Sequence, residues 1–287
     1  MSYQFPKHYL SVSERLSHIL DIVGYSREDR NKNVTTANEI EVYLNIANAL
    51  RGRESTYIFG SRGEGSTGPG LQSDTDYLNE IKTIKVVSNM SQCDPKMKNV
   101  FMVKDNHTHP GYLKLQPIRI SPDYTPVPVY QYSDNDKIYC IDSLYRTALK
   151  NTSYHDHHNG IVNGPAVNIT NNRKVLSRDF VKALRCSIWP EEGYEWFLRR
   201  RLHGWLSPKQ IENTRTYGYF VTPVGHPHIW CLVKWRCSFS IAERDIVRSF
   251  EDTTMKVYLL LKMIKKTYIE PYVGDAFSSY HCKVCMF

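Results

Sequence analysis

The chain has 287 residues, is 41% hydrophobic, and carries 37 Lys and Arg against 29 Asp and Glu, which gives a net charge of +8 at pH 7. This length is enough to bury a large core in one domain or in two lobes that share an interface, and the composition excludes an intrinsically disordered chain. The positive charge excludes an acidic buffer-type protein and permits a polyanionic partner without proving one.

Helices are predicted first, at the N-terminus. Ser11 and Thr36 are each followed three residues later by a Glu, the capping-box pattern that marks a helix start. Apolar runs then predict short strands, which are Thr56–Phe59, a strand that opens at Asp74, Ile84–Val87 and Tyr112–Ile120. Residues 60–70 form a Gly-rich turn between the first two strands.

The second half begins with residues 151–174, a polar stretch rich in Gly and Asn that predicts a surface loop. Ser177–Arg185 has the character of a strand, and the pattern from Glu191 onward is mostly helical. The segment Ser240–Lys266 has the length and pattern of two helices. This order predicts an α+β fold in which a mixed β-sheet and helices form one lobe and helices form another.

No Pro/Ser linker separates independent domains, so the two lobes are expected to form one integrated unit. We place the first lobe at residues 1–205 and the helical C-terminal lobe at residues 206–287. No secretory signal is evident at Met1–Pro6, and the longest apolar stretch, Val257–Ile264, is too short to cross a bilayer. Seven cysteines, mostly isolated, indicate reduced thiols. We therefore expect a cytoplasmic protein.

The chemistry is concentrated around the Gly-rich turn. Gly60 and Ser61 directly follow an apolar strand, so backbone N–H groups and the Ser61 hydroxyl are available to hold a terminal phosphate. Asp74 and Asp76 are two residues apart, which on a strand places both carboxylates on one face. A divalent cation relieves their repulsion, and oxygen ligands of this kind suit Mg²⁺ or Mn²⁺, which also bind phosphates. Either feature alone is usually structural; together, in this order, they favour a nucleotidyltransferase.

The stretch Gly60–Gly65, followed by Pro69–Asp76, resembles the active-site signature of the male-abnormal (Mab) domain nucleotidyltransferase family, which includes cyclic GMP-AMP synthase and the receptors similar to it. Similar blocks follow in the family's order over nearly the whole chain: Gly164–Ala166, Asp179–Val181 with Ala183 and Leu184, Trp189 and Pro190, Trp196 with Arg199, Arg201, Gly204 and Trp205, Trp235–Ser240 with Glu243, and Ser278–His281 with Lys283. The resemblance implies a bilobal nucleotidyltransferase fold, here with an abbreviated helical C-terminal lobe.

The resemblance also implies roles for individual residues. Asp74, Asp76 and Asp179 would be the catalytic residues and would bind two metal ions, one activating the attacking hydroxyl and the other steadying the triphosphate. The nucleotide-binding residues would be Gly60, Ser61, Arg236, Ser238, Ser240, Glu243, Lys262 and Tyr280, with Lys262 at the donor phosphates and Tyr280 stacked on a base. Judged from the residues alone, Arg236 also fits a structural ion pair, Tyr280 a core position, and the two serines helix caps.

Basic residues are concentrated after residue 173, and six of them are the predicted nucleic-acid surface: Lys174, Lys182, Arg185, Arg199, Arg200 and Arg201. Such a cluster fits a solvated helix face as well as a surface for duplex backbone. The family's DNA sensor carries a His/Cys zinc insertion after its Trp-Arg-x-Ser-Phe-Ser helix, whereas residues 241–255 contain neither Cys nor His. We therefore expect no structural zinc and favour double-stranded RNA over DNA as the partner.

The resulting prediction is a metal-dependent nucleotidyltransferase. It would join ATP and/or GTP into a cyclic dinucleotide, with release of pyrophosphate, when nucleic acid is bound, in innate immune signalling. One alternative is a catalytically inactive scaffold or developmental protein of the same family, which the short C-terminal lobe favours. Another is a nucleotidyltransferase that acts on linear RNA, which shares the Gly-Ser and Asp-x-Asp core but lacks the later blocks.

Overall fold

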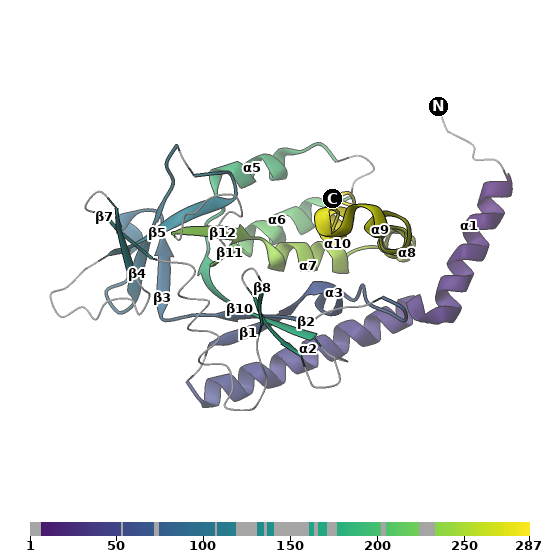
Figure 1. Cartoon of the computed structure of the whole chain (residues 1–287), viewed down its shortest axis with the longest axis horizontal. Helices are drawn as coiled ribbons and strands as arrows, with labels where there is room; N and C mark the ends of the chain where they lie inside the picture. The colour runs from purple at the N-terminus through teal and green to yellow at the C-terminus, as the bar shows by residue number, and fades with distance from the viewer. Residues whose placement is uncertain are drawn as a thin grey trace.

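The computed structural model shows a mixed β-sheet flanked by helices, with the C-terminal helices gathered beside α7 (Figure 1). It describes residues 7–52, 54–71, 75–106, 108–118, 131–134, 137–140, 161–163, 166–170, 177–201, 205–223 and 233–287. The α+β class predicted from the order of elements is confirmed.

The N-terminal helices begin at other residues than the sequence suggested. They are α1 (Lys7–Leu20), a π-helical turn η1 (Asp21–Tyr25), and α2 (Arg27–Leu50), and α1 extends away from the rest of the molecule (Figure 1). Ser26 caps α2: its hydroxyl accepts from the Asp29 N–H at 3.1 Å, and its own N–H donates to the Asp29 carboxylate at 3.2 Å. The predicted starts at Ser11 and Thr36 are wrong, because both residues lie inside helices.

Ten strands form one sheet in the described part of the chain. They are β1 (Ser55–Phe59), β2 (Thr75–Glu80), β3 (Ile84–Val87), β4 (Lys98–Val103), β5 (Tyr112–Ile118), β8 (Ile161–Asn163), β9 (Ala166–Thr170), β10 (Ser177–Cys186), β11 (Tyr219–Thr222) and β12 (Lys234–Ser238). The main order is β1-β2-β10-β11-β12-β5-β4-β3, and β8 and β9 branch off at β10. A separate hairpin is formed by β6 (Gln131–Asp134) and β7 (Lys137–Cys140).

Strands lie at two places in the second half of the chain where none was predicted. The expected loop at 151–174 contains β8 and β9. The described residues from Glu191 onward are mostly helical, as predicted, but they also supply β11 and β12. All four residues of β11 are buried, and a short, fully buried run has no alternation that separates a strand from a helix. The sheet therefore continues past residue 205, and the division into lobes there stays a prediction.

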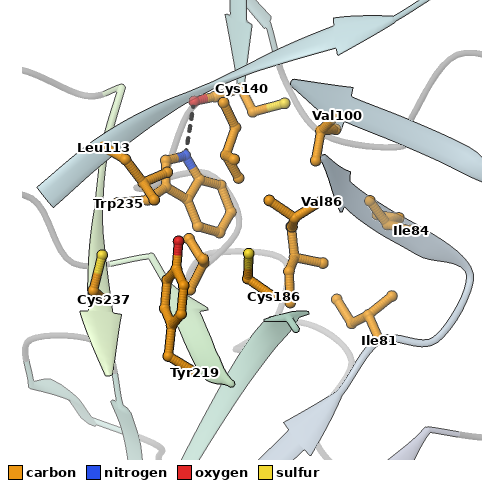
Figure 2. Close-up of a cluster of buried hydrophobic side chains, with 13 residues drawn as sticks. Ile81, Ile84, Val86, Val100, Leu113, Cys140, Cys186, Tyr219, Trp235 and Cys237 are labelled. Carbon is orange, nitrogen blue, oxygen red and sulfur yellow. Dashed lines mark hydrogen bonds between the residues drawn. The ribbon is translucent and has the colours of Figure 1, made fainter. Parts of the chain in front are cut away.

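The largest buried cluster lies between the strands at the β3–β12 side of the sheet (Figure 2). Trp235 is fully buried, and its indole N–H donates to the Cys140 carbonyl at 3.1 Å, which satisfies the polar atom that burial would otherwise leave unpaired. The hydroxyl of Tyr219 donates to the Met102 sulfur at 3.1 Å. This cluster fixes β12, which carries Arg236 and Ser238.

The remaining helices are α5 (Glu191–Leu198), α6 (Pro208–Thr216), α7 (Ser240–Arg248), α8 (Asp252–Ile264), α9 (Glu270–Val273) and α10 (Ser279–Val284), with short turns α3 (Gly60–Glu64), η2 (Met90–Gln92), η4 (Lys265–Ile269) and η5 (Gly274–Ala276). Helices α5, α6, α7, α8 and α10 contribute residues to a second buried cluster. The two helices predicted within Ser240–Lys266 are confirmed as α7 and α8. Leu20 and Tyr25 from the N-terminal helices join Val247 and Leu259 in this cluster. No helix within the described ranges combines the length and the apolar content needed to cross a membrane.

Candidate active site

Two of the three predicted catalytic carboxylates lie side by side in the sheet. Strand β10 runs parallel to β2, and Asp179 is the register partner of Asp76. Paired positions on neighbouring strands share a face and lie about 4.8 Å apart. Across the other side of β2, Asp76 is the partner of Phe59, the last residue of β1. Both carboxylates therefore lie at the edge where the Gly-Ser turn begins. Asp74 lies outside the described residues.

The Gly-Ser turn forms the short helix α3 directly after β1. Gly60 opens it with φ of 69°, a conformation that favours glycine. A Cβ at Gly63 would lie 2.3 Å from the Ile58 carbonyl oxygen, so only glycine allows α3 to pack this closely on β1. The Ser66 N–H donates to the Ser61 carbonyl at 2.9 Å and closes the turn. Ser61 therefore follows two residues after Phe59, the register partner of Asp76.

Helix α8 reaches this turn with a lysine. The Lys262 ammonium donates to the Ser61 hydroxyl and to the Ser66 carbonyl, both at 2.9 Å, although the residue is only 6% exposed. Burial lowers the pKa of Lys262 to about 8, and the nearby carboxylate of Glu64 only partly opposes this shift. A desolvated ammonium with uncharged oxygens as its close partners is well suited to receive an anion.

Sequence reasoning assigned no role to Glu64 or Lys283, which form a buried ion pair behind the turn. Glu64 of α3 is 3% exposed, and the Lys283 ammonium of α10 contacts its carboxylate. The same ammonium lies 3.3 Å from the carboxylate of Glu243 on α7. No local signal marks this pair, since a Glu in a Gly-rich turn is ordinarily solvated and its partner is 219 residues away.

The predicted base-binding residues lie along β12, α7 and α10. Arg236 is exposed on β12, and the hydroxyls of Ser238 and Ser240 are 2.6 Å apart. Tyr280 is 54% exposed, with the Lys283 ammonium 5.8 Å from its ring centre. Burial raises the pKa of Tyr280, Glu243 raises it further, and Lys283 and Arg236 lower it, so these side chains are close enough to interact. An exposed ring with this neighbourhood is not a core residue.

The six basic residues of the predicted nucleic-acid surface differ in their surroundings. Lys174 lies outside the described residues, and Lys182 is 3.6 Å from the carboxylate of Glu54. Arg185 donates to the Tyr217 carbonyl at 3.1 Å, and Arg201 donates to the Trp196 carbonyl at 2.9 Å while lying over its ring. These two guanidinium groups hold local structure. Arg199 and Arg200 are exposed, and nucleic-acid binding by this set stays a prediction.

A divalent cation fits the carboxylate edge by the chemistry of its donors. Asp76 and Asp179 supply carboxylate oxygens on one face of adjacent strands, and such ligands suit Mg²⁺ or Mn²⁺. Within the described ranges no group of three or more His, Cys, Asp or Glu side chains is placed to hold a metal. The third carboxylate of the predicted set, Asp74, is outside those ranges.

Fold and site together define a protein of the nucleotidyltransferase class. Residues 95–249, more than half of the chain, match the Mab-21 protein nucleotidyltransferase domain family. The chain belongs to this family, which is the family of the proteins similar to cyclic GMP-AMP synthase, and its substrates are nucleotides. The matched segment includes Asp179 and Arg236 and begins after the Gly-Ser turn, so Ser61 and Asp76 lie outside it and their roles stay predictions.

Proposed function

We propose that the protein is a metal-dependent synthase that joins ATP and/or GTP into a cyclic dinucleotide and releases pyrophosphate. The observation that carries this proposal is the register of Asp179 with Asp76 beside the Gly60–Ser61 turn, where Lys262 also ends. These groups combine a place for a triphosphate with adjacent carboxylates. Positioning and neutralisation of charge are the main sources of catalysis in phosphoryl transfer.

In the proposed reaction, a 2′ or 3′ hydroxyl of one nucleotide attacks the α-phosphorus of the other. The new P–O bond forms while the bond from the α-phosphorus to the bridging oxygen breaks, and pyrophosphate leaves with the electron pair. The same displacement then occurs within the linear dinucleotide: its free 2′ or 3′ hydroxyl attacks the remaining α-phosphorus, which closes the ring and releases a second pyrophosphate. Asp179 accepts the proton of the attacking hydroxyl, while Ser61 and Lys262 hold the triphosphate. Bound divalent cations would supply positive charge at the phosphates, and Asp76, Asp179 and Asp74 would hold them.

The predicted setting is also part of the proposal. The activator is a double-stranded nucleic acid, with RNA favoured because the segment after the Trp235–Ser240 block has no zinc ligands. The process is innate immune signalling in the cytoplasm. Exposed Arg199 and Arg200 support contact with a phosphate backbone, which is read by charge and shape rather than by sequence.

The test is incubation of the full chain with ATP, GTP, CTP and UTP, with Mg²⁺ or Mn²⁺, and with double-stranded RNA or DNA. We expect pyrophosphate and a dinucleotide, and we expect Asp76→Asn and Asp179→Asn each to abolish both products while circular dichroism shows a retained fold. Asp105→Asn is the matched control, because this carboxylate pairs with Lys114 away from the turn.

A folded wild-type chain that forms no pyrophosphate with any of these ligands contradicts the proposal and supports the inactive scaffold. Elongation of an RNA primer, without a cyclic product, supports the enzyme that acts on linear RNA instead. Equal activity of the Asp76→Asn variant and of wild type would remove the carboxylate pair from the chemistry.

A further inference from the structure

Four charged side chains meet in the buried space behind the Gly-Ser turn, each from a different helix. They are Glu64 of α3, Glu243 of α7, Lys262 of α8 and Lys283 of α10. Two positive and two negative charges balance as a set, yet they are not paired one to one. Which carboxylates each ammonium group contacts decides which ammonium group is free to bind a substrate phosphate.

Lys283 contacts both carboxylates. Its ammonium contacts Glu64 and lies 3.3 Å from Glu243. Burial by itself lowers the pKa of Lys283, but the two carboxylates outweigh it and raise the pKa above the ordinary value. This direction is the one expected for an ammonium that faces ionised carboxylates in a low-dielectric site.

Lys262 is left with uncharged oxygens, those of Ser61 and Ser66. Glu64 is nonetheless close to it, since the Ser66 hydroxyl lies 3.5 Å both from the Glu64 carboxylate and from the Lys262 ammonium. A buried carboxylate without a partner is costly and draws in the nearest cation. After Lys283, the cation that acts most strongly on Glu64 is Lys262.

We propose that Lys283 is a positioning residue: it neutralises Glu64 and so leaves Lys262 at Ser61 to bind a nucleotide triphosphate. The identity of the ligand rests on the function proposed above, whereas the distribution of charges rests on the contacts alone. Tyr280, the predicted nucleobase contact, lies one helical turn from Lys283 on α10, and its ring centre is 5.8 Å from the same ammonium. The ion pair of Lys283 with Glu64 therefore also fixes the position of Tyr280 relative to the Gly-Ser turn.

The experiment uses the full chain and ATP with Mg²⁺, with affinity measured by calorimetry at pH 7. Lys283→Met should weaken binding by about tenfold to a hundredfold, the effect of losing one hydrogen bond to a charged group. Glu64→Gln with Lys283→Met should return the affinity to within about threefold of wild type. Lys283→Arg keeps the charge and should retain binding. Lys256→Met is the matched control, because this buried lysine pairs with Asp21 and Asp252 away from the turn.

A second readout needs no nucleotide. NMR of the lysine side chains in the free chain should show that Lys283→Met raises the pKa of Lys262 above about 8, because Lys262 gains a carboxylate and loses a like charge. The double variant should return it toward the wild-type value. This readout separates failure of the inference from failure of the proposed function, which would be absence of ATP binding by wild type.

Three results would overturn the inference. One is unchanged ATP affinity and an unchanged Lys262 pKa in Lys283→Met, which would mean that Glu64 takes up a proton instead of capturing Lys262. Another is a double variant that binds as weakly as Lys283→Met, which would make Lys283 a direct phosphate ligand. If Lys283→Met does not fold, the charge-balanced double variant decides alone, and loss of its binding counts against the inference.

Discussion

The low pKa of Lys262 predicts how the proposed triphosphate site responds to pH. Burial lowers this pKa to about 8 in the free protein, and a bound triphosphate should raise it again because opposite charges favour the ammonium. The charged form is therefore the one that binds. Affinity should be constant below pH 8 and should fall as the pH rises through that value, by about tenfold between pH 7 and pH 9.

The other groups around Lys262 do not produce this response. Burial raises the pKa of Tyr258 and of Cys282, and the carboxylates raise that of Lys283. Burial also raises the pKa of Glu64, and the contact with Lys283 opposes this shift. ATP contributes little, since phosphate loses its second proton near pH 6. We assign the response to Lys262, and Lys262→Met should therefore remove it along with most of the affinity.

The stability of Lys262→Met follows from the same shift. A pKa of about 8 instead of 10.5 corresponds to roughly 3 kcal/mol by which burial disfavours the charged lysine at neutral pH. This cost is present below pH 8 and is relieved as the pH rises toward 10.5. Removing the charge offsets the loss of its hydrogen bonds to Ser61 and Ser66, about 1 to 3 kcal/mol, so the Tm of the free variant should stay within a few degrees of wild type.

Calorimetric titration of ATP with Mg²⁺ at half-unit steps from pH 7 to pH 9 measures the predicted fall in affinity. Repeating it in two buffers of different ionisation enthalpy measures the proton taken up by Lys262 near pH 8 to 9. An affinity that stays flat over this range, or a Lys262→Met variant with the wild-type slope, would refute the assignment of Lys262 to the triphosphate.

The remaining predictions concern the helices that hold the turn. Arg244→Met should lower the free energy of unfolding, measured in urea, by about 2 to 4 kcal/mol, because the Arg244 guanidinium is 2.7 Å from the carboxylate of Glu41 in a largely buried pair. The control is Arg215→Met, which removes an exposed contact with Glu212 and should lower the free energy of unfolding by less than about 1 kcal/mol. Ser26→Ala should cost about 1 kcal/mol as the loss of a helix cap, and Ser11→Ala, inside α1, should cost little; equal costs would contradict the assigned start of α2.

Local patterns in the sequence predicted part of the site. A Gly-Ser turn after an apolar strand and a pair of Asp residues at strand spacing are readable because they depend on neighbours only, and β1, β3 and β10 form where the pattern placed them. The helix starts were missed because a Ser or Thr three residues before a Glu also occurs by chance within helices, while the true cap at Ser26 uses an Asp.

Contacts across long sequence separations could not be predicted in this way. The register of Asp179 with Asp76 depends on a parallel pairing of strands about a hundred residues apart, which no local pattern specifies. The pair of Glu64 with Lys283 depends on how α10 packs against α3. The resemblance to a known family pointed to Asp179 from the sequence, but it gave no role to Glu64, because no chemistry is apparent in this residue until its burial is known.

The Gly-Ser turn is held in place through β1 and α7, which bears on how the proposed activator could act. On its outer side, the edge strand β1 has its backbone groups satisfied by α2 and α7: the Ile58 N–H donates to Glu41 at 2.8 Å, and Arg244 donates to the Ile58 carbonyl at 2.9 Å. Arg248 donates to the Gly63 carbonyl at 2.8 Å, which ties α7 to α3 itself. Because α7 also carries Ser240 and Glu243 of the predicted base-binding set, a displacement of α2 against α7 would move the Gly-Ser turn and these two residues together.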